Sequence, residues 1–329
     1  MPAPRRILFV VSGRNEVSCR FRVLQYIPHL RRVGIHVEVA DLQGVAGARW
    51  KILRSARDYD SVCVHRACLS RLEQRWLRRA AGGYVFDFDD AIMFRDSSQR
   101  RFASWQRRQR FRRMVAGART VIAGNGYLAE WASRFSERVT VIPTAIDPSA
   151  YPERRTEPSG ELVIGWIGTR INLMYLRTIV PALTRVARQR PDVKLKIVSD
   201  GFLDIAGVPV VNKRWSLADE VADVTSFHVG IMPLPDDPWT RGKCAVKILQ
   251  YFAAALPVVC SPVGANLDVV EHGRSGYFAA TVAEWVARLD ELLGDAHRRR
   301  QFGQAGRDRM QREYSIESTA DRLVKALVG

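Results

Sequence analysis

The sequence of 329 residues lacks the features that mark several classes of protein. No apolar run reaches the roughly 18–20 residues that a membrane-spanning helix needs, and no hydrophobic signal core follows the start. The five cysteines are scattered and form no CxxC pair, which excludes a regular disulfide framework or a cysteine zinc site and is typical of a reducing cytosol. We therefore predict a soluble, cytoplasmic protein.

The charge is of mainly one sign and is unevenly placed. The net charge is +17, and residues 1–150 carry 27 basic against 13 acidic side chains, a net charge of +14. A basic first half indicates an anionic partner, such as nucleic acid, an anionic membrane surface or a phosphorylated substrate. Hydrophobic residues make up 47% of the chain, which is ordinary for a folded protein, and the length predicts two domains.

The first half has the pattern of an α/β domain. A strand at Ile7–Val11, the Ser12-Gly13 turn, a helix from about Ser18 to Val33 and a strand at Ile35–Ala40 form a βαβ unit. Continuous apolar runs of this kind are typical of parallel strands that are covered on both faces. Further strands are predicted at Ser61–His65, Tyr84–Phe88, Thr120–Ala123 and Val139–Ile142.

The pattern restarts after Tyr151–Gly160, whose prolines, glycine and charges predict a linker. Strands follow at Leu162–Ile167, Lys194–Ser199, Val208–Val211, Val229–Pro233 and Leu256–Cys260, and helices at Tyr175–Gln189, Leu217–Thr225 and Cys244–Ala255. The whole predicts an α/β fold of two Rossmann-like domains facing one another across a ligand cleft. We place them at residues 1–155 and 156–310, with a helix over 311–329 that packs back on the first domain.

Two glycine turns and one basic loop are candidate phosphate sites. Gly13 and Gly168 each follow a strand and would let backbone amides approach an anion, although a plain turn is the alternative. Neither spells GxGxxG with an acidic residue about twenty positions on, which disfavours a nicotinamide dinucleotide. Lys243 and Lys247 lie at the start of a strongly apolar helix, where two ammonium groups beside free amides suit a diphosphate. A solvated helix end is the alternative.

The segment Arg241–Gly264 resembles the retaining glycosyltransferases of family 4, whose fold, GT-B, has two Rossmann-like domains. That family commonly reads EAMACGLPVVASDVGG and then EVVEDGKTGYLV, where this chain has LQYFAAALPVVCSPVG and then LDVVEHGRSGYFA. The similarity extends over nearly the whole chain, through SCRFRVLQYIPHLRRVGI, FDFDDAI, VIPTAID and IGWIGTRINLMYL. It implies transfer of a sugar with retention from a nucleotide sugar to an acceptor hydroxyl, in the synthesis of cell-surface glycans or glycoconjugates.

The resemblance also implies roles for individual residues, with a nucleotide sugar as substrate and no cofactor or metal required. The implied donor-binding residues are Gly168, Arg170, Lys243, Lys247, Gln250 and Gly264. The family's pair of glutamates falls on Gly242 and Gln250. Gln250 can still hydrogen-bond the donor's ribose, whereas Gly242 cannot replace the glutamate that contacts the transferred sugar. Lys247 and the other cations would stabilise charge on the leaving diphosphate.

The run Asp87-Phe88-Asp89-Asp90 contains a DxD, the metal-binding signature of the other large glycosyltransferase fold. Because that fold has one domain, we favour acceptor orientation or proton handling by Asp89 or Asp90, with a helix cap as a further alternative. The other predicted acceptor or cleft residues are Gly13, Arg14, Arg20 and His65. Arg20 and Arg22 point about 200° apart on a helix, so only one can meet the ligand, and we favour Arg20. For His65 the alternative is a core or turn histidine.

Two arginine groups account for the basic first half. One is a helix face of Arg71, Arg75, Arg78 and Arg79, and the other is the cluster Arg107, Arg108, Arg110, Arg112 and Arg113. They form either a solvated face or a peripheral contact with anionic lipid at the inner face of the membrane, near a phosphorylated, lipid-linked or glycan acceptor. Nucleic acid is disfavoured because no binding motif accompanies the charge. The alternative function is a non-catalytic basic α/β protein that binds nucleic acid or anionic membrane.

Overall fold

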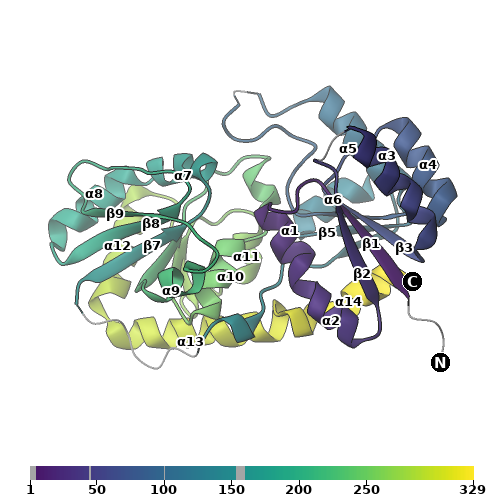
Figure 1. Cartoon of the computed structure of the whole chain (residues 1–329). Helices are drawn as coiled ribbons and strands as arrows, with labels where there is room; N and C mark the ends of the chain where they lie inside the picture. The colour runs from purple at the N-terminus through teal and green to yellow at the C-terminus, as the bar shows by residue number, and fades with distance from the viewer. Residues whose placement is uncertain (1–4, 44–45, 100, 153–159) are drawn as a thin grey trace. The chain divides into compact units, whose positions relative to one another are not determined.

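The computed structural model describes residues 5–43, 46–99, 101–152 and 160–329. The chain forms two compact units, each with a six-stranded sheet (Figure 1). The first unit comprises Met1–Ala145, Asp237–Cys244 and Ile316–Gly329, and the second comprises Ile146–Asp236 and Ala245–Ser315. The predicted domain boundary at residue 155 and most of the predicted linker lie outside the described residues.

The sheet of the first unit has the strand order β2-β1-β3-β4-β5-β6, and every neighbouring pair is parallel. Its strands are β1 Arg6–Val11, β2 His36–Asp41, β3 Ser61–His65, β4 Val85–Phe88, β5 Thr120–Ala123 and β6 Val139–Val141. Each lies within one residue of its predicted position. The apolar runs of the sequence therefore predict these strands correctly, because the strands are buried on both faces.

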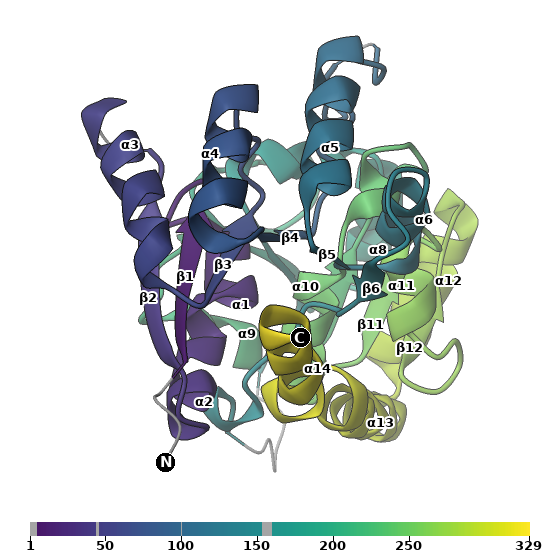
Figure 2. The same cartoon turned by 90° about the vertical axis from the view of Figure 1, so that its right-hand side faces the viewer.

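The helical segments of the first unit cover both faces of this sheet. They are α1 Val17–Arg22, η1 Leu24–Tyr26, α2 Ile27–Arg32, α3 Ala46–Ser55, η2 Ala56–Asp58, α4 Arg71–Ala81, α5 Trp105–Gly117, α6 Gly126–Ser133, η5 Thr240–Gly242 and α14 Ile316–Val328. Figure 2 shows α3, α4 and α5 side by side along one face. On the other face, α14 contacts α2, β3 and β5.

Successive side chains of β1 point to opposite faces of the sheet, so the core of the first unit has two layers. Leu8 and Val10 pack in the cluster that includes residues of α4 and α5, whereas Ile7, Phe9 and Val11 pack in the cluster that includes residues of α14. The single helix predicted from Ser18 to Val33 is wrong. The segment is three short helices, because Val23 leaves the helical region and Pro28 starts a new helix near its N-terminus.

The sheet of the second unit has the order β12-β11-β10-β7-β8-β9 and is also parallel. Its strands are β7 Leu162–Ile167, β8 Val193–Ser199, β9 Val210–Arg214, β10 Val229–Met232, β11 Val258–Cys260 and β12 Gly276–Phe278. Read from β9, this is the Rossmann strand order. The sequence prediction placed β9 two residues too early and did not include β12.

The helical segments of the second unit are η3 Pro148–Ala150, η4 Arg170–Asn172, α7 Leu173–Arg177, α8 Val180–Gln189, α9 Glu220–Thr225, α10 Val246–Ala253, α11 Ala265–Val269, α12 Val282–Gly294 and α13 Ala296–Glu313. The helix predicted over Tyr175–Gln189 is broken, because Pro181 begins a separate helix. The α/β fold with two Rossmann-like parts is confirmed.

Strand order also places a switch point in each unit. In open parallel sheets, ligands bind at the carboxyl ends of strands whose connections run in opposite directions. That point lies between β1 and β3 in the first unit and between β7 and β10 in the second. His65 ends β3, Gly168 directly follows β7, and Gly13 is the second residue after β1.

Candidate active site

The switch point of the first unit holds a buried ion pair. Arg22 Nε donates to Asp87 Oδ2 at 3.2 Å, its Nη2 contacts Asp87 Oδ1, and its Nη1 donates to the Ile142 carbonyl at 2.6 Å. His65 is fully buried, and its Nδ1 lies 2.7 Å from Asp87 Oδ2. Burial alone would raise the pKa of Asp87, but Arg22 and His65 outweigh it and lower that pKa to about 2. Asp87 is therefore ionised at neutral pH.

Ser18 connects this pair to Asp89. Its hydroxyl donates to Asp89 Oδ2 at 2.6 Å and lies 2.8 Å from His65 Nε2. Both Ser18 and Asp89 are buried. Within the part of the chain that the structure describes, nothing donates a hydrogen bond to the other carboxylate oxygen, Asp89 Oδ1, although it is buried. Burying a carboxylate oxygen without a hydrogen-bond donor costs free energy. Asp89 Oδ1 is therefore a candidate contact for a ligand that donates a hydrogen bond.

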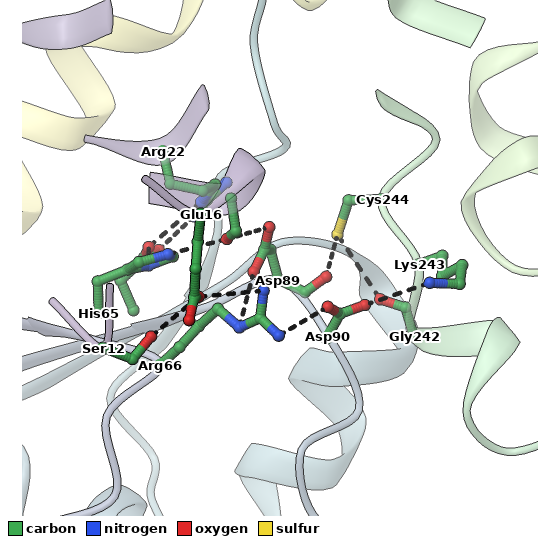
Figure 3. Close-up of polar contacts among 12 residues, drawn as sticks. Ser12, Glu16, Arg22, His65, Arg66, Asp89, Asp90, Gly242, Lys243 and Cys244 are labelled. Atoms are coloured by element: carbon green, nitrogen blue, oxygen red, sulfur yellow. Dashed lines mark hydrogen bonds and ion pairs between the residues drawn. The ribbon is translucent and has the colours of Figure 1, made fainter. Parts of the chain in front are cut away.

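Arg66 balances the acidic residues that follow β4 (Figure 3). Its guanidinium lies 3.0 Å from Asp90 Oδ2, 3.7 Å from Asp89 Oδ1 and 4.0 Å from Glu16 Oε2. Burial would lower the pKa of Arg66, but the carboxylates of Asp90, Asp89 and Glu16 raise it. The backbone of Arg66 is left-handed, with φ of 56°, a strained conformation that is common at functional sites.

Gly242, Lys243 and Cys244, at the end of the segment Asp237–Cys244, lie against the Asp89-Asp90 turn (Figure 3). Lys243 Nζ is 3.9 Å from Asp90 Oδ1, and Cys244 Sγ donates to the Asp89 carbonyl at 3.3 Å. A Cβ at Gly242 would lie 2.6 Å from Ala91 Cβ and 2.7 Å from the Ala91 nitrogen. The FDFDDAI motif therefore occupies the space that a side chain at Gly242 would need.

Ser18, Arg22, His65, Arg66, Asp87, Asp89 and Asp90 form a polar network in the first unit. Other predicted residues of this unit lie at its periphery. Gly13 is buried after β1, where a Cβ would lie 2.7 Å from Gln43 Nε2. Arg14 is exposed, and its backbone nitrogen donates to Asp41 at 2.7 Å. Arg20 is partly exposed, with its guanidinium 4.3 Å from the Phe21 ring centroid. Of the two arginines on α1, Arg22 is the buried one, so the ligand role of Arg20 stays a prediction.

The switch point of the second unit is a glycine covered by a lysine. A Cβ at Gly168 would lie 2.8 Å from Lys247 Cε and 2.9 Å from its Nζ, so this amine lies directly over the turn. The same amine is 5.2 Å from the Trp166 ring centroid. Arg170 follows on η4 with an exposed side chain, and its backbone nitrogen donates to Asp200. The structure therefore brings the predicted Lys247 to Gly168, whereas the Arg170 side chain lies beside Gly201.

The remaining predicted donor residues are dispersed. Gln250 is buried on α10, and its Nε2 donates to the Tyr151 hydroxyl at 3.5 Å. Gly264 has φ of 54° before α11, a conformation that favours glycine. Lys243 precedes α10 by three residues and belongs to the first unit, so its prediction as the start of the helix is wrong.

A metal at the DxD run has little chemical support. Both oxygens of Asp87 are engaged by Arg22 and His65, and Arg66 lies between Asp89 and Asp90. Across residues 5–43, 46–99, 101–152 and 160–329, no group of histidine, cysteine, aspartate or glutamate side chains has the arrangement of a metal site. The acidic turn is instead partnered by cations of the protein.

The sequence prediction missed Ser18, Arg66 and Cys244 as members of the network. Arg66 was detectable as the basic residue directly after a strand end, next to His65. Local sequence predicts Ser18 only as part of a helix, because its hydroxyl contact with Asp89 joins residues 71 positions apart.

The two arginine groups lie on neighbouring helices of the first unit. Arg71, Arg75, Arg78 and Arg79 are all exposed on α4, and Arg107, Arg108, Arg110 and Arg112 are exposed on α5. Two large apolar side chains accompany them at the surface, Leu72 with 71% and Trp105 with 75% exposure. None of the described helices is both long and apolar enough to cross a membrane.

Comparison with known proteins finds a family match in the second half of the chain. Residues 161–295 match the family described as Glycosyl transferases group 1. The chain is 27% identical over 223 residues to alpha-maltose-1-phosphate synthase of Mycolicibacterium smegmatis, a match that covers 57% of this chain and 56% of that protein. The chain therefore spans little more than half the length of that relative.

Solved structures with the GT-B fold match nearly the whole chain. Anabaena HepE in complex with UDP and glucose has a TM-score of 0.73 at 16% identity, covering 98% of both chains. Sucrose-phosphate synthase of Thermosynechococcus elongatus also has a TM-score of 0.73, at 12% identity and with the same coverage. These likenesses confirm the GT-B fold.

Proposed function

We propose that this protein is a glycosyltransferase that takes a sugar from a nucleotide sugar, with the donor's diphosphate bound by the second unit. The observation that carries the proposal is the amine of Lys247 lying over Gly168 at the Rossmann switch point. A glycine turn lets backbone amides reach the phosphates, and a lysine and an arginine neutralise them. The group 1 match of residues 161–295 covers this turn and Lys247.

The reaction requires stabilisation of the diphosphate as it leaves and a hydroxyl to replace it. Lys247 and Arg170 of the second unit are positively charged groups suited to the first task. Asp89 and Asp90 of the first unit are suited to orient the acceptor hydroxyl or take its proton. Retention of configuration, and a place in cell-surface glycan or glycoconjugate synthesis, follow from the resemblance to family 4.

The substrates are proposed from the chemistry of the related proteins. HepE was solved with UDP, and the names of the two synthases describe phosphorylated sugar products. We propose a nucleoside-diphosphate sugar, with uridine tested first, and an acceptor that is a phosphorylated sugar, a glycan or a lipid-linked sugar. No bound cofactor is required for this chemistry.

Titration calorimetry with UDP and other nucleoside diphosphates tests the donor site. Wild type should bind one of them saturably in high salt. Lys247→Ala should weaken that binding by roughly 1.5–3 kcal/mol, the scale of a hydrogen bond to a charged group. Lys194→Ala is the matched control, because its amine pairs with Glu161 in the same unit. Binding that only polyanions produce and that salt abolishes would instead favour a non-catalytic basic protein.

We further propose a cytoplasmic protein that attaches reversibly to the inner face of the membrane through α4 and α5. The support is the exposed arginines on these two helices, with Leu72 and Trp105 among them. Anionic lipid attracts basic side chains, and exposed aromatic and aliphatic groups insert at the headgroup level. Such attachment would bring the enzyme to a lipid-linked acceptor.

A further inference from the structure

A continuous chain of hydrogen bonds joins Asp87 to Asp89 in the first unit. His65 Nδ1 lies 2.7 Å from Asp87 Oδ2, His65 Nε2 lies 2.8 Å from Ser18 Oγ, and Ser18 Oγ lies 2.6 Å from Asp89 Oδ2. All four residues are buried. The number of hydrogens that these groups supply is limited, so the contacts determine how those hydrogens are placed.

Counting hydrogens leaves two arrangements. Asp87 is ionised and only accepts, so His65 Nδ1 carries a hydrogen. The single hydroxyl hydrogen of Ser18 goes either to Asp89 or to His65. If it goes to an ionised Asp89, then His65 Nε2 must donate to Ser18 and the ring is an imidazolium. If it goes to His65, the ring is neutral and Asp89 carries the proton. One proton is therefore shared between His65 and Asp89.

The groups around these hydrogen bonds favour the first arrangement, in which His65 is an imidazolium and Asp89 is ionised. The Asp87 carboxylate stabilises a charged His65, and Arg66, 3.7 Å from Asp89 Oδ1, stabilises an ionised Asp89. Other titratable or charged groups also face these hydrogen bonds: Glu16, Cys19 and Arg22 near α1, Tyr26 on η1, Cys63 on β3, Asp90 after β4, and Lys243 and Cys244 in the segment Asp237–Cys244. A charged His65 thus lies beside the Asp87 carboxylate, and an ionised Asp89 lies beside the Arg66 guanidinium.

We propose that Ser18 and His65 keep Asp89 ionised, by holding the shared proton on His65, so that Asp89 can take the proton of the acceptor hydroxyl. This inference rests on the proposed sugar transfer. The place for the hydroxyl is Asp89 Oδ1, which is buried and accepts no hydrogen bond from any described residue. The hydroxyl reaches it when Arg66 turns toward Asp90, with which it already pairs at 3.0 Å.

The step balances in atoms and electrons. The acceptor oxygen forms a bond to the anomeric carbon of the sugar, while the bond from that carbon to the diphosphate oxygen breaks and its electron pair leaves with the diphosphate. The hydroxyl proton passes to Asp89 Oδ1. Ser18 continues to donate to Oδ2 throughout. Ser18 and His65 touch no substrate in this scheme and are positioning residues, whereas Asp89 is the catalytic residue.

Steady-state kinetics measured across a range of pH, with three serine variants, test the role of the hydrogen bonds from Ser18 to His65 and Asp89. Ser18→Ala should lower kcat about 100-fold, the lower range for a general base, with donor affinity unchanged. The pH at which its rate falls to half on the acid side should rise, because the ionised carboxylate loses a donor. Ser18→Thr retains the hydroxyl and should restore most of kcat. Ser61→Ala, a buried serine on the same strand as His65, should match wild type. An unchanged kcat and pH profile in Ser18→Ala would overturn the proposal.

Nitrogen NMR of histidine-labelled protein gives a readout that does not depend on turnover. The His65 signals are assigned by their loss in His65→Gln. At neutral pH we expect hydrogens on both ring nitrogens of His65 in wild type. A ring with a hydrogen on Nδ1 alone would overturn the proposal even where sugar transfer is established. An imidazolium in a wild type that transfers no sugar would refute the proposed function and leave the hydrogen count intact.

Discussion

The two switch points handle charge in different ways. In the first unit, Arg22, Asp87, His65 and Asp89 are buried together. Asp87 contacts Arg22 and His65, and Asp89 faces Arg66. In the second unit, Lys247 lies over a glycine and near the face of Trp166, and Arg170 is exposed. One site is a buried polar network, and the other is a glycine turn with a lysine amine over it.

This difference separates two chemical tasks. A hydroxyl is neutral and needs a positioned acceptor for its proton, which a rigid, internally balanced network provides. A diphosphate carries its own charge and needs cations and amides that face it. If the comparison is right, variants in the first network should affect folding and turnover, whereas variants at the second turn should affect donor affinity and leave the fold intact.

The largest expected effect is on stability, from Asp87→Asn. Loss of this carboxylate leaves the buried Arg22 without its counterion, which should cost about 3–5 kcal/mol in the free energy of unfolding. The matched change in the second unit is Asp223→Asn, whose partners Lys196 and Lys213 are 17% and 37% exposed. That change should cost less, because both amines can turn into solvent. Urea unfolding measures both, and equal losses would contradict the comparison.

A second prediction tests whether the first site depends on close backbone packing. Gly242→Ala places a Cβ against Ala91 and should destabilise the protein by about 1–3 kcal/mol, the usual cost of overpacking. Gly126→Ala is the control, because a Cβ there meets no atom within 4 Å. We expect thermal unfolding to show a loss for the first variant only. Full stability in Gly242→Ala would mean that the segment Asp237–Cys244 moves freely.

A third prediction concerns how the free energy of unfolding changes at acid pH. The pKa of Asp87 is about 2 in the folded protein, below the ordinary value of 3.8, so the unfolded chain takes up the proton first as pH falls. The stabilisation is complete above about pH 4 and is lost as pH falls toward 2, by about 2 kcal/mol. The difference in unfolding free energy between wild type and Asp87→Asn should narrow over this range. A constant difference would show that the pKa of Asp87 is not lowered in the folded protein.

A fourth prediction concerns the arginines outside the network. The protein should sediment with anionic vesicles at low salt and ignore neutral vesicles, since each nearby basic side chain contributes about 1 kcal/mol. Salt should release it. Changing Arg107, Arg108, Arg110, Arg112 and Arg113 to glutamine should abolish sedimentation and spare diphosphate binding by the second unit. Equal recovery of wild type and variant would mean that these arginines are only a solvated face.

The smallest expected effect is that of chelation. Because Arg66 and Lys243 already face the acidic turn, we expect sugar transfer to persist in a chelator. The rate is measured before and after dialysis against the chelator and again with added manganese. A complete loss that manganese restores would make Asp89 and Asp90 metal ligands.

Much of the fold follows from local pattern. The strands Ser61–His65, Thr120–Ala123 and Leu162–Ile167 were predicted to the residue, because buried parallel strands are short apolar runs that end at glycine or polar residues. Helix breaks were harder, since Pro28 and Pro181 interrupt apolar segments whose periodicity continues across them. Predicted residues such as Asp89, Asp90 and His65 were found from their positions at strand ends.

The sequence by itself determined which residues lie at the carboxyl ends of the strands, because that depends only on where each apolar run stops. Tertiary structure decided how they pair. Ser18, His65, Asp87 and Asp89 come from three separate segments, and the hydrogen bonds that join them form only because a parallel sheet brings β3 and β4 side by side under α1. Likewise, Gly242 lacks a side chain because Ala91 fills the space, a contact across about 150 residues of chain that no local pattern encodes.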